Sequence, residues 1–341
     1  MLALQPNSSI QHSLLGEISV PVFHDVERAA LRIKAYVHRT PLLRSSLLDE
    51  IANAQVWLKA ENLQVTGSFK ARGAFNALLN MSPEQISRGV IAYSTGNHGQ
   101  AIAWAARQLN TKATIIMPFD APKNKILGAS KHGAEVKLYD RRHESREAIG
   151  IKIVEETGGT LIPPGDHPDV LAGQGTVILE ALADFQREIG ENLGNFITPF
   201  GGGGLAAGSS LVLNQLSPST RIFTVEPAGF DDMARSLSSG RRESNPARSQ
   251  SICDALQAVT PAELPYEINR RFMTGAVVVS DEEVIIAIRF ALEQLHVVVE
   301  PGGCVALAAI LSGKLPLNGE NTILVLSGGN IDMPLLEGML R

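Results

Sequence analysis

The sequence predicts an α/β protein whose mostly parallel sheets are covered by helices on both faces. Short runs of β-branched and aliphatic residues alternate with helical patterns, as in "GVIAYST" followed by "GNHGQAIAWAARQLN". The strand-like runs are continuously apolar, which is typical of strands buried on both faces. Three of them lead into glycine-bearing segments, "STGNHGQ", "PFGGGGLAAG" and "LSGGN", at strand ends where such folds bind ligands.

The alternating elements fall into two sets, which predict two three-layer α/β/α domains. In the first set, the strands "GVIAYST", "KATIIMP", "AEVKLYD" and "GTLIPP" alternate with the helices "GNHGQAIAWAARQLN", "APKNKILGASKHG" and "SREAIGIKIVEETG". The second set contains "NFITPFGGGG", "LAAGSSLVLNQL", "RIFTVEP" and "NTILVLSGGN". We therefore expect a flexible N-terminus at 1–18, a small domain at 89–164, and a large domain at 19–88 and 165–341 into which the small one is inserted.

Composition excludes several classes of function. The 341 residues are 44% hydrophobic and carry a net charge of −5 without any basic block, so capture of nucleic acid or of an anionic membrane surface is not expected. The N-terminus lacks the pattern of a signal peptide, and the apolar run "VVVEPGGCVALAAIL" is interrupted by Glu300 and Pro301. Cys253 and Cys304 are too few for a disulfide framework. We expect a soluble cytoplasmic protein.

The stretch "NLQVTGSFKARGAF", residues 62–75, places a lysine where a helical apolar pattern begins. A cation at a helix N-terminus opposes the macrodipole by a few tenths of a kcal/mol, which is too little to decide its role. A solvated Lys70 in a first helical turn is the simplest interpretation of this segment taken alone.

A second segment, "FGGGGLAAG" at 200–208, stands between a predicted strand and a predicted helix. Backbone N–H groups without a Cβ, aimed by a helix N-terminus, bind phosphate, although a tightly packed turn is the alternative. Gly202, Gly204 and Ala207 also satisfy a loose G-x-G-x-x-A, with Glu226 about 20 residues later as a dinucleotide site requires. The loop alone indicates phosphate and leaves both kinds of cofactor open.

Taken together, these segments resemble a known family. "HRTPLLRSSLLDE", "KAENLQVTGSFKARGA", "STGNHGQAIA", "LAGQGTVILE", "GGGGL", "VEPAGFDD", "VEPGG" and "LSGGNID" occur in the order found in fold type II, tryptophan-synthase-β-like pyridoxal-phosphate enzymes. The resemblance is to the branch of threonine/serine dehydratases and serine racemases, and it runs from about Val20 to Leu336. It implies that pyridoxal 5'-phosphate (PLP) binds in the cleft between the two domains.

The resemblance also implies site residues. Lys70 matches the Schiff-base lysine, Phe69 the residue packed on the cofactor ring, Asn97 the partner of the ring hydroxyl, and Ser327 the residue facing the pyridine nitrogen. Gly201, Gly202, Gly203 and Gly204 match the phosphate cradle, beside the backbone of Leu205. Ser94, Asn97 and His98 match the turn that holds the substrate carboxylate. Glu226, Asp232 and the carbonyl of Phe230 match a site for Mg²⁺ or Ca²⁺, with a solvated acidic turn as the alternative.

The residue types suit this chemistry. A lysine that is nucleophilic near neutral pH needs a lowered pKa, and once free of the cofactor it can act as a general base at Cα. Thr95 stands where racemases of the branch carry a serine that protonates the opposite face of Cα, so racemisation is less favoured. Arg146 matches an arginine that can face the active-site mouth and bind a second substrate carboxylate, with a solvated helix arginine as the alternative.

The sequence therefore predicts a PLP-dependent ammonia-lyase. We expect it to eliminate water and then ammonia from a β-hydroxy amino acid, L-threonine or L-serine, and to act as a homodimer. Serine racemase and 3-hydroxyaspartate ammonia-lyase are the alternatives within the family, and an NAD(P)-dependent oxidoreductase is a distant one. A C-terminal regulatory domain is not expected, because the chain ends eleven residues after Asn330.

Overall fold

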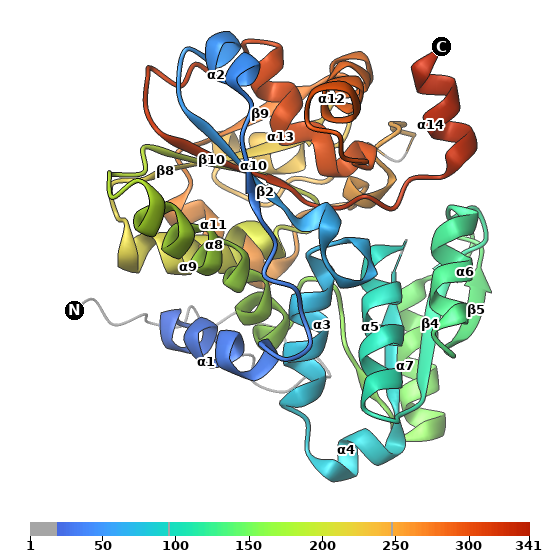
Figure 1. Cartoon of the computed structure of the whole chain (residues 1–341). Helices are drawn as coiled ribbons and strands as arrows, with labels where there is room; N and C mark the ends of the chain where they lie inside the picture. The colour runs from blue at the N-terminus through green and yellow to red at the C-terminus, as the bar shows by residue number, and fades with distance from the viewer. Residues whose placement is uncertain (1–18, 95, 247) are drawn as a thin grey trace.

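The structure, a computed structural model, describes residues 19–94, 96–246 and 248–341 (Figure 1). The described strands form two sheets, one of six strands in the order β1-β2-β10-β7-β8-β9 and one of four strands in the order β5-β4-β3-β6. Among the described neighbours, β1 and β2 pair antiparallel and the other pairs are parallel. The predicted α/β class with mostly parallel sheets is confirmed.

The large sheet is apolar on both faces. Its strands are β1 Leu42–Leu43, β2 Val56–Ala60, β10 Thr322–Leu326, β7 Asn195–Pro199, β8 Arg221–Pro227 and β9 Gly275–Val279. Because side chains alternate along a strand, Trp57 faces one helical layer while Val56 and Leu58 face the other. This double burial explains why the strand sequences are continuously apolar.

Helices cover both faces of the large sheet. On the face of Trp57 lie α1 Phe23–Ile33, α8 Pro168–Glu188 and α9 Gly204–Leu216. On the opposite face lie α2 Ser46–Ala52, α12 Asp281–Gln294, α13 Pro301–Leu311 and α14 Met333–Leu340. Two shorter helices, α10 Asp232–Ser239 and α11 Glu263–Phe272, follow β8 and precede β9.

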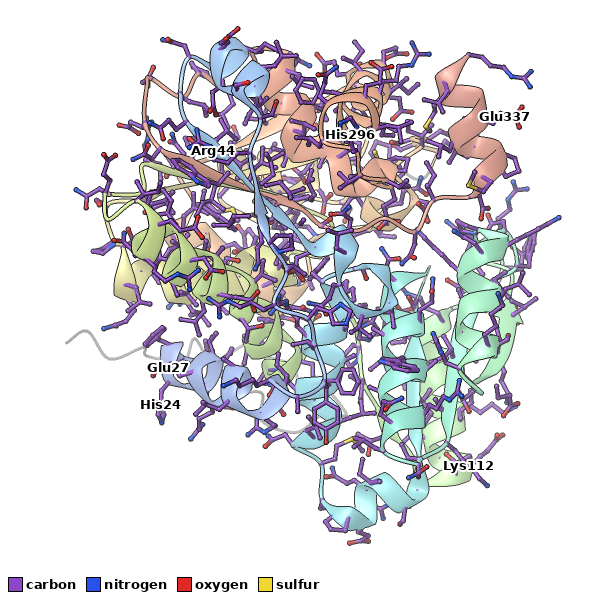
Figure 2. All side chains as sticks on the ribbon, in the orientation of Figure 1. His24, Glu27, Arg44, Lys112, His296 and Glu337 are labelled. Atoms are coloured by element: carbon purple, nitrogen blue, oxygen red, sulfur yellow. The ribbon has the colours of Figure 1, made fainter. Side chains whose placement is uncertain are left out.

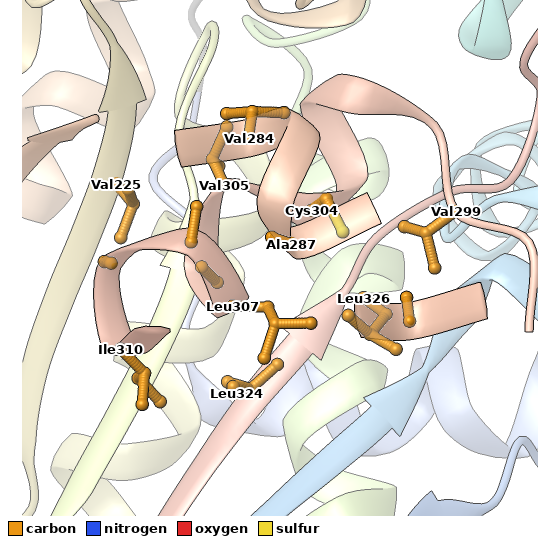
Figure 3. Close-up of a cluster of buried hydrophobic side chains, with 14 of the residues drawn as sticks. Val225, Val284, Ala287, Val299, Cys304, Val305, Leu307, Ile310, Leu324 and Leu326 are labelled. Atoms are coloured by element: carbon orange, nitrogen blue, oxygen red, sulfur yellow. The ribbon is translucent and has the colours of Figure 1, made fainter. Parts of the chain in front are cut away.

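Helix α13 is the innermost of these helices, since its residues from Pro301 to Ile310 are all buried. Figure 3 shows Cys304, Val305 and Leu307 of this helix among side chains of α12, β8 and β10. A helix that is apolar all round has to be buried, and α13 fills the layer between the sheet and α12.

The small sheet is built entirely from residues that lie between β2 and β7 in the sequence. Its strands are β5 Glu135–Tyr139, β4 Ala113–Pro118, β3 Val90–Tyr93 and β6 Thr160–Leu161. Helices α5 Asn97–Gln108 and α6 Lys123–Lys131 pack on one face, and α7 Arg146–Thr157 packs on the other. Helices α3 Lys70–Leu79 and α4 Pro83–Arg88 lead from the large sheet into this unit.

The periphery carries the charged side chains. In Figure 2 the labelled His24, Glu27, Lys112 and Glu337 extend outward from different parts of the molecule. Within the described ranges, no helix combines the length and the apolar character needed to cross a bilayer. The interior between the two sheets is where polar residues gather, and it contains the site described next.

Candidate active site

A cavity of about 900 Å³ lies between the large sheet and the small one. The loops that follow β3, β7 and β10 reach it, because the carboxyl ends of these strands point toward the same region. The predicted residues that line it are Phe69, Lys70, Ser94, Asn97, His98, Arg146, Gly201, Gly202, Gly203, Gly204, Leu205, Phe230 and Ser327.

Lys70 is the first residue of α3, and its amine faces the cavity. Nζ donates a hydrogen bond to the carbonyl oxygen of Pro164 at 3.3 Å and lies 5.0 Å from the centre of the Phe69 ring. Burial lowers the pKa of the Lys70 amine to about 8. At pH 7 about a tenth of it is then neutral, against less than about a thousandth for an ordinary lysine.

Ser327 is held beside Lys70 by the backbone. The N–H of Phe69 donates to the carbonyl oxygen of Ser327 at 3.1 Å, and Ser68 forms an antiparallel bridge with Gly328. The end of β10 is thereby joined to the turn that precedes α3. Two segments more than 250 residues apart in the sequence thus form one wall of the cavity.

The glycine loop connects β7 to the N-terminus of α9. Gly203 has φ of 89°, and a Cβ there would lie 2.7 Å from the ring of Phe200, so this position requires glycine for both conformation and space. A Cβ on Gly202 or Gly204 would meet no described protein atom closer than 3.7 Å and would project into free space. The loop therefore leaves room for a ligand group next to the N–H groups at the start of α9.

The turn after β3 is fixed by a serine. The Oγ of Ser94 accepts hydrogen bonds from the N–H groups of Gly96 and Gly99, both at 2.9 Å. His98 is buried, and its Nε2 lies 2.9 Å from the carbonyl oxygen of Ile162, so Nε2 carries the proton. Burial and the nearby Lys70 charge lower the pKa of His98 to about 3, which keeps the imidazole neutral. Thr95, predicted to act at Cα, lies outside the described residues.

Arg146 is the first residue of α7, and it lines the cavity. Its guanidinium carbon lies 4.9 Å from the centre of the Tyr93 ring, and its Nε donates to Glu147 at 2.8 Å. Burial would lower the pKa of Arg146, but the Glu147 carboxylate outweighs that effect and holds it above its usual value. The arginine is thus stacked on an aromatic side chain of the cavity wall, not extended into solvent.

The predicted metal ligands gather at the end of β8. Glu226 and Asp232 are both buried, and the oxygens of Glu226 accept the N–H groups of Met233 and Ala234 at 2.8 Å. Burial, together with the charge of Asp232, raises the pKa of Glu226 to about 8, and burial raises that of Asp232 to about 6. The Oδ2 atom of Asp232 is buried without a hydrogen-bond partner. A divalent cation suits such a carboxylate pair, although no three His, Cys, Asp or Glu side chains in the described ranges cluster in metal-binding geometry.

The dinucleotide alternative does not fit this geometry. Glu226 would have to hydrogen-bond a ribose in front of the glycine loop. Its carboxylate is instead fully buried and bonded to the start of α10, and it does not line the cavity. The spacing of Gly202 and Glu226 is therefore a coincidence of sequence.

Several cavity residues were not assigned a role from the sequence. Glu300 lies in the cavity wall and accepts a hydrogen bond from the amide of Asn97, and Asn330 donates to the same amide at 2.9 Å. Asp166 also lines the cavity and accepts the N–H of Leu264 at 2.9 Å. The signal that could have identified Glu300 is a lone carboxylate inside the apolar run "VVVEPGG".

The residues present fit a pyridoxal phosphate. This cofactor needs an amine for its aldehyde, N–H donors for its phosphate, and polar partners for its ring hydroxyl and ring nitrogen. Lys70 supplies an amine of lowered pKa, and Gly202 and Gly204 leave a cradle that a Cβ would fill. Asn97 and Ser327 supply the polar side chains in the same cavity.

Comparison with known proteins identifies the class. The family described as "Pyridoxal-phosphate dependent enzyme" matches residues 33–328. The chain is 44% identical to the L-threo-3-hydroxyaspartate ammonia-lyase of Saccharomyces cerevisiae, covering 92% of this chain and 94% of that one. The protein belongs to the family of pyridoxal-phosphate-dependent enzymes, as the sequence motifs predicted.

Other relatives and solved structures agree. An L-threo-3-hydroxyaspartate ammonia-lyase of Pseudomonas sp is 41% identical over 94% of this chain and 98% of its own length. The L-threonine ammonia-lyase of Thermotoga maritima is 37% identical over 93% of this chain and 77% of its length. The structure of maize serine racemase matches with a TM-score of 0.88 at 34% identity, covering 94% of this chain and 97% of that one. The fold predicted from the sequence is thereby confirmed.

Proposed function

We propose that this protein is a PLP-dependent ammonia-lyase whose preferred substrate is L-threo-3-hydroxyaspartate. The reaction removes the β-hydroxyl as water, and hydrolysis of the resulting imine gives a 2-oxo acid and ammonia. L-Threonine and L-serine, which the motifs alone favoured, are then poorer substrates of the same chemistry. The single observation that carries this preference is Arg146 in the cavity wall.

The argument for Arg146 is electrostatic. 3-Hydroxyaspartate differs from serine by a second carboxylate, and burying that charge costs free energy unless a cation receives it. The Arg146 guanidinium is held on the Tyr93 ring, and only its Nε is bonded to Glu147. Its other N–H groups leave a planar fork for a carboxylate. The two relatives named for this substrate are also the two at 41–44% identity.

The other residues have separate tasks. When bound, the cofactor withdraws electrons from Cα of the amino acid. Lys70, with its lowered pKa, accepts the Cα proton. The turn of Ser94, Asn97 and His98 holds the α-carboxylate, and the neutral hydroxyl of Ser327 faces the ring nitrogen without supplying a charge.

The Arg146→Gln variant tests the preference. We expect kcat/KM for L-threo-3-hydroxyaspartate to fall by about 10–100-fold, the loss of roughly 1.5–3 kcal/mol for a charged hydrogen bond, while kcat/KM for L-serine changes little. Arg142→Gln is the matched control, because Arg142 is exposed and does not line the cavity. Equal losses on both substrates would show that Arg146 only supports the fold.

We also propose that Glu226, Asp232 and the carbonyl of Phe230 hold Mg²⁺ or Ca²⁺. The orphaned Oδ2 of Asp232 and the raised pKa values of both carboxyls support a missing positive charge. A cation at 100 times its Kd would stabilise the fold by about 2.7 kcal/mol. The Tm should therefore rise with added Mg²⁺ or Ca²⁺ in the wild type and stay constant in Asp232→Asn. A wild-type Tm that does not respond would remove the site.

Three further properties remain predictions. Racemisation of serine is the alternative activity, and chiral analysis of serine after incubation measures it. A homodimer is expected, and light scattering after size-exclusion chromatography would give twice the chain mass. Residence in the cytoplasm would be checked by fractionation of the source cells.

A further inference from the structure

One lysine is buried where the unit of the small sheet meets the large sheet. Lys125 lies on α6 and is 1% exposed. Its Nζ is 2.6 Å from Oδ2 of Asp254 and 2.8 Å from Oε2 of Glu300, which belong to the loops before and within the far side of the large-sheet unit. Burying an ammonium group is costly unless it is closely paired, so this arrangement is more demanding than a surface ion pair.

The two oxygens of Glu300 face donors on both sides. Oε2 faces the ammonium of Lys125, and Oε1 accepts a hydrogen bond from Nδ2 of Asn97. Neither oxygen has an acceptor to which a carboxylic acid could donate. Burial raises the pKa of the Glu300 carboxyl, and the charge of Lys125 opposes that rise. Lys125 is therefore the group that keeps Glu300 an acceptor toward Asn97.

The other end of the Asn97 amide is fixed by Asn330. The Nδ2 of Asn330 donates to the carbonyl oxygen of Thr66 at 2.8 Å and to Oδ1 of Asn97 at 2.9 Å. Because a backbone carbonyl only accepts, the Asn330 amide has one allowed orientation. Asn97 must then present Oδ1 to Asn330 and Nδ2 to Glu300. One N–H of Nδ2 is used by Glu300, and the other remains for a group in the cavity that Asn97 lines.

Glycines hold this chain of contacts from two sides. A Cβ on Gly328 would lie 2.1 Å from Oε1 of Glu300, and a Cβ on Gly96 would lie 2.1 Å from Cδ of Lys125. Neither glycine has a positive φ, so space alone requires the small residue. With no free volume around them, Glu300 and Lys125 have little room to change rotamer.

We propose that Lys125, Glu300 and Asn330 are positioning residues that lock the amide of Asn97 so that one of its N–H groups is always available to the ring hydroxyl of the cofactor. The inference rests on the proposed contact between Asn97 and that hydroxyl. A donated N–H stabilises the ionised hydroxyl over the neutral one. The lock therefore sets the ionisation of the bound cofactor, and with it the visible absorption, before any substrate arrives.

The test is the absorption spectrum of the purified holoprotein without substrate. The ratio of the visible band near ~410–420 nm to the band at shorter wavelength reports the ionised fraction of the ring hydroxyl. We expect Lys125→Met and Asn330→Ala to lower this ratio about tenfold, which corresponds to one pKa unit. Lys125→Met/Glu300→Gln should recover most of the ratio, because a neutral Gln still offers its amide oxygen to Asn97. Lys123→Met, on the exposed side of α6, should keep the wild-type spectrum.

The outcomes separate the inference from its basis. An unchanged ratio in Asn97→Ala would overturn the contact of Asn97 with the cofactor, and the inference with it. A lowered ratio in Asn97→Ala, combined with wild-type ratios in Lys125→Met and Asn330→Ala, would overturn the inference alone. If Lys125→Met does not accumulate as a folded protein, Asn330→Ala decides, since it leaves the ion pair intact.

Discussion

Two buried ionic networks lie in this protein, and they differ in composition and in what they touch. The first contains Arg72 of α3, Glu61 at the end of β2, Glu180 of α8 and Lys59 of β2, which is two cations with two anions. The second contains Lys125 with Glu300 and Asp254, which is one cation with two anions. No member of the first network lines the cavity, whereas Glu300 of the second does.

The comparison shows that burial of charge serves different ends in the two places. The carboxylate of Glu61 receives Nε and Nη2 of Arg72 at 2.8 and 2.7 Å and the hydroxyl of Thr40 at 2.5 Å, so the first network is saturated internally. It ties α3, the helix that begins with Lys70, to β2 and α8. The second network ends on an amide that faces the cavity, so its effect is expected on the bound cofactor more than on the fold.

Breaking the first network should have the largest effect on stability. Arg72→Met leaves Glu61 buried without its partner, and we expect the free energy of unfolding to fall by about 3–5 kcal/mol. Urea unfolding of the cofactor-loaded protein measures it, with the exposed Arg107→Met expected within about 0.5 kcal/mol of wild type. The folded fraction of Arg72→Met should keep the wild-type ratio of absorption bands. A changed ratio would mean that the two networks are not separate.

A glycine pair extends the contrast to the cofactor cradle. In Gly202→Ala the new methyl group has 3.9 Å to the nearest described protein atom and projects toward the cavity, so the fold should hold while cofactor affinity falls about 10–100-fold. In Gly338→Ala, on α14, nothing lies within 4 Å and the helix should gain about 0.5–1 kcal/mol. Titration of the apoprotein with cofactor gives both affinities. Equal affinities in the two variants would place the phosphate elsewhere.

The pKa of Lys70 gives the smallest but most specific effect. Only the neutral amine attacks an aldehyde, so capture of the cofactor by the apoprotein should quicken about tenfold per pH unit and level off above about pH 8. A lysine of ordinary pKa would keep accelerating toward pH 10. Stopped-flow growth of the visible band measures the rate. A rate that continues to climb between pH 8 and 10 would show that burial does not lower the pKa of Lys70.

The sequence was most informative where chemistry is encoded in consecutive residues. Lys70, the four glycines from Gly201 and the turn at Asn97 were all predicted, because each belongs to a short motif whose residue types have a physical reason. Glu300 and Lys125 were not assigned, because their partners lie more than 100 residues away and become neighbours only in the fold. Arg146 remained ambiguous because only the fold shows that the Tyr93 ring receives it.

Cys304 illustrates the opposite case. Its place near the N-terminus of a predicted helix suggested that its thiol pKa could be lowered, although a packing role was preferred. In the structure it is fully buried among the side chains of α12 and β10, and burial raises its pKa. Desolvation therefore outweighs the helix dipole at this position, which a linear motif does not reveal.

The central claim is that this cavity eliminates water and ammonia from a β-hydroxy amino acid with a second carboxylate. The most direct measurement is the rate of 2-oxo acid formation by the purified holoprotein with L-threo-3-hydroxyaspartate, L-serine and L-threonine. We predict that kcat/KM is highest for L-threo-3-hydroxyaspartate, by about tenfold or more over the other two. A protein that carries the cofactor but forms no 2-oxo acid from any of the three, or that prefers L-threonine, would contradict it.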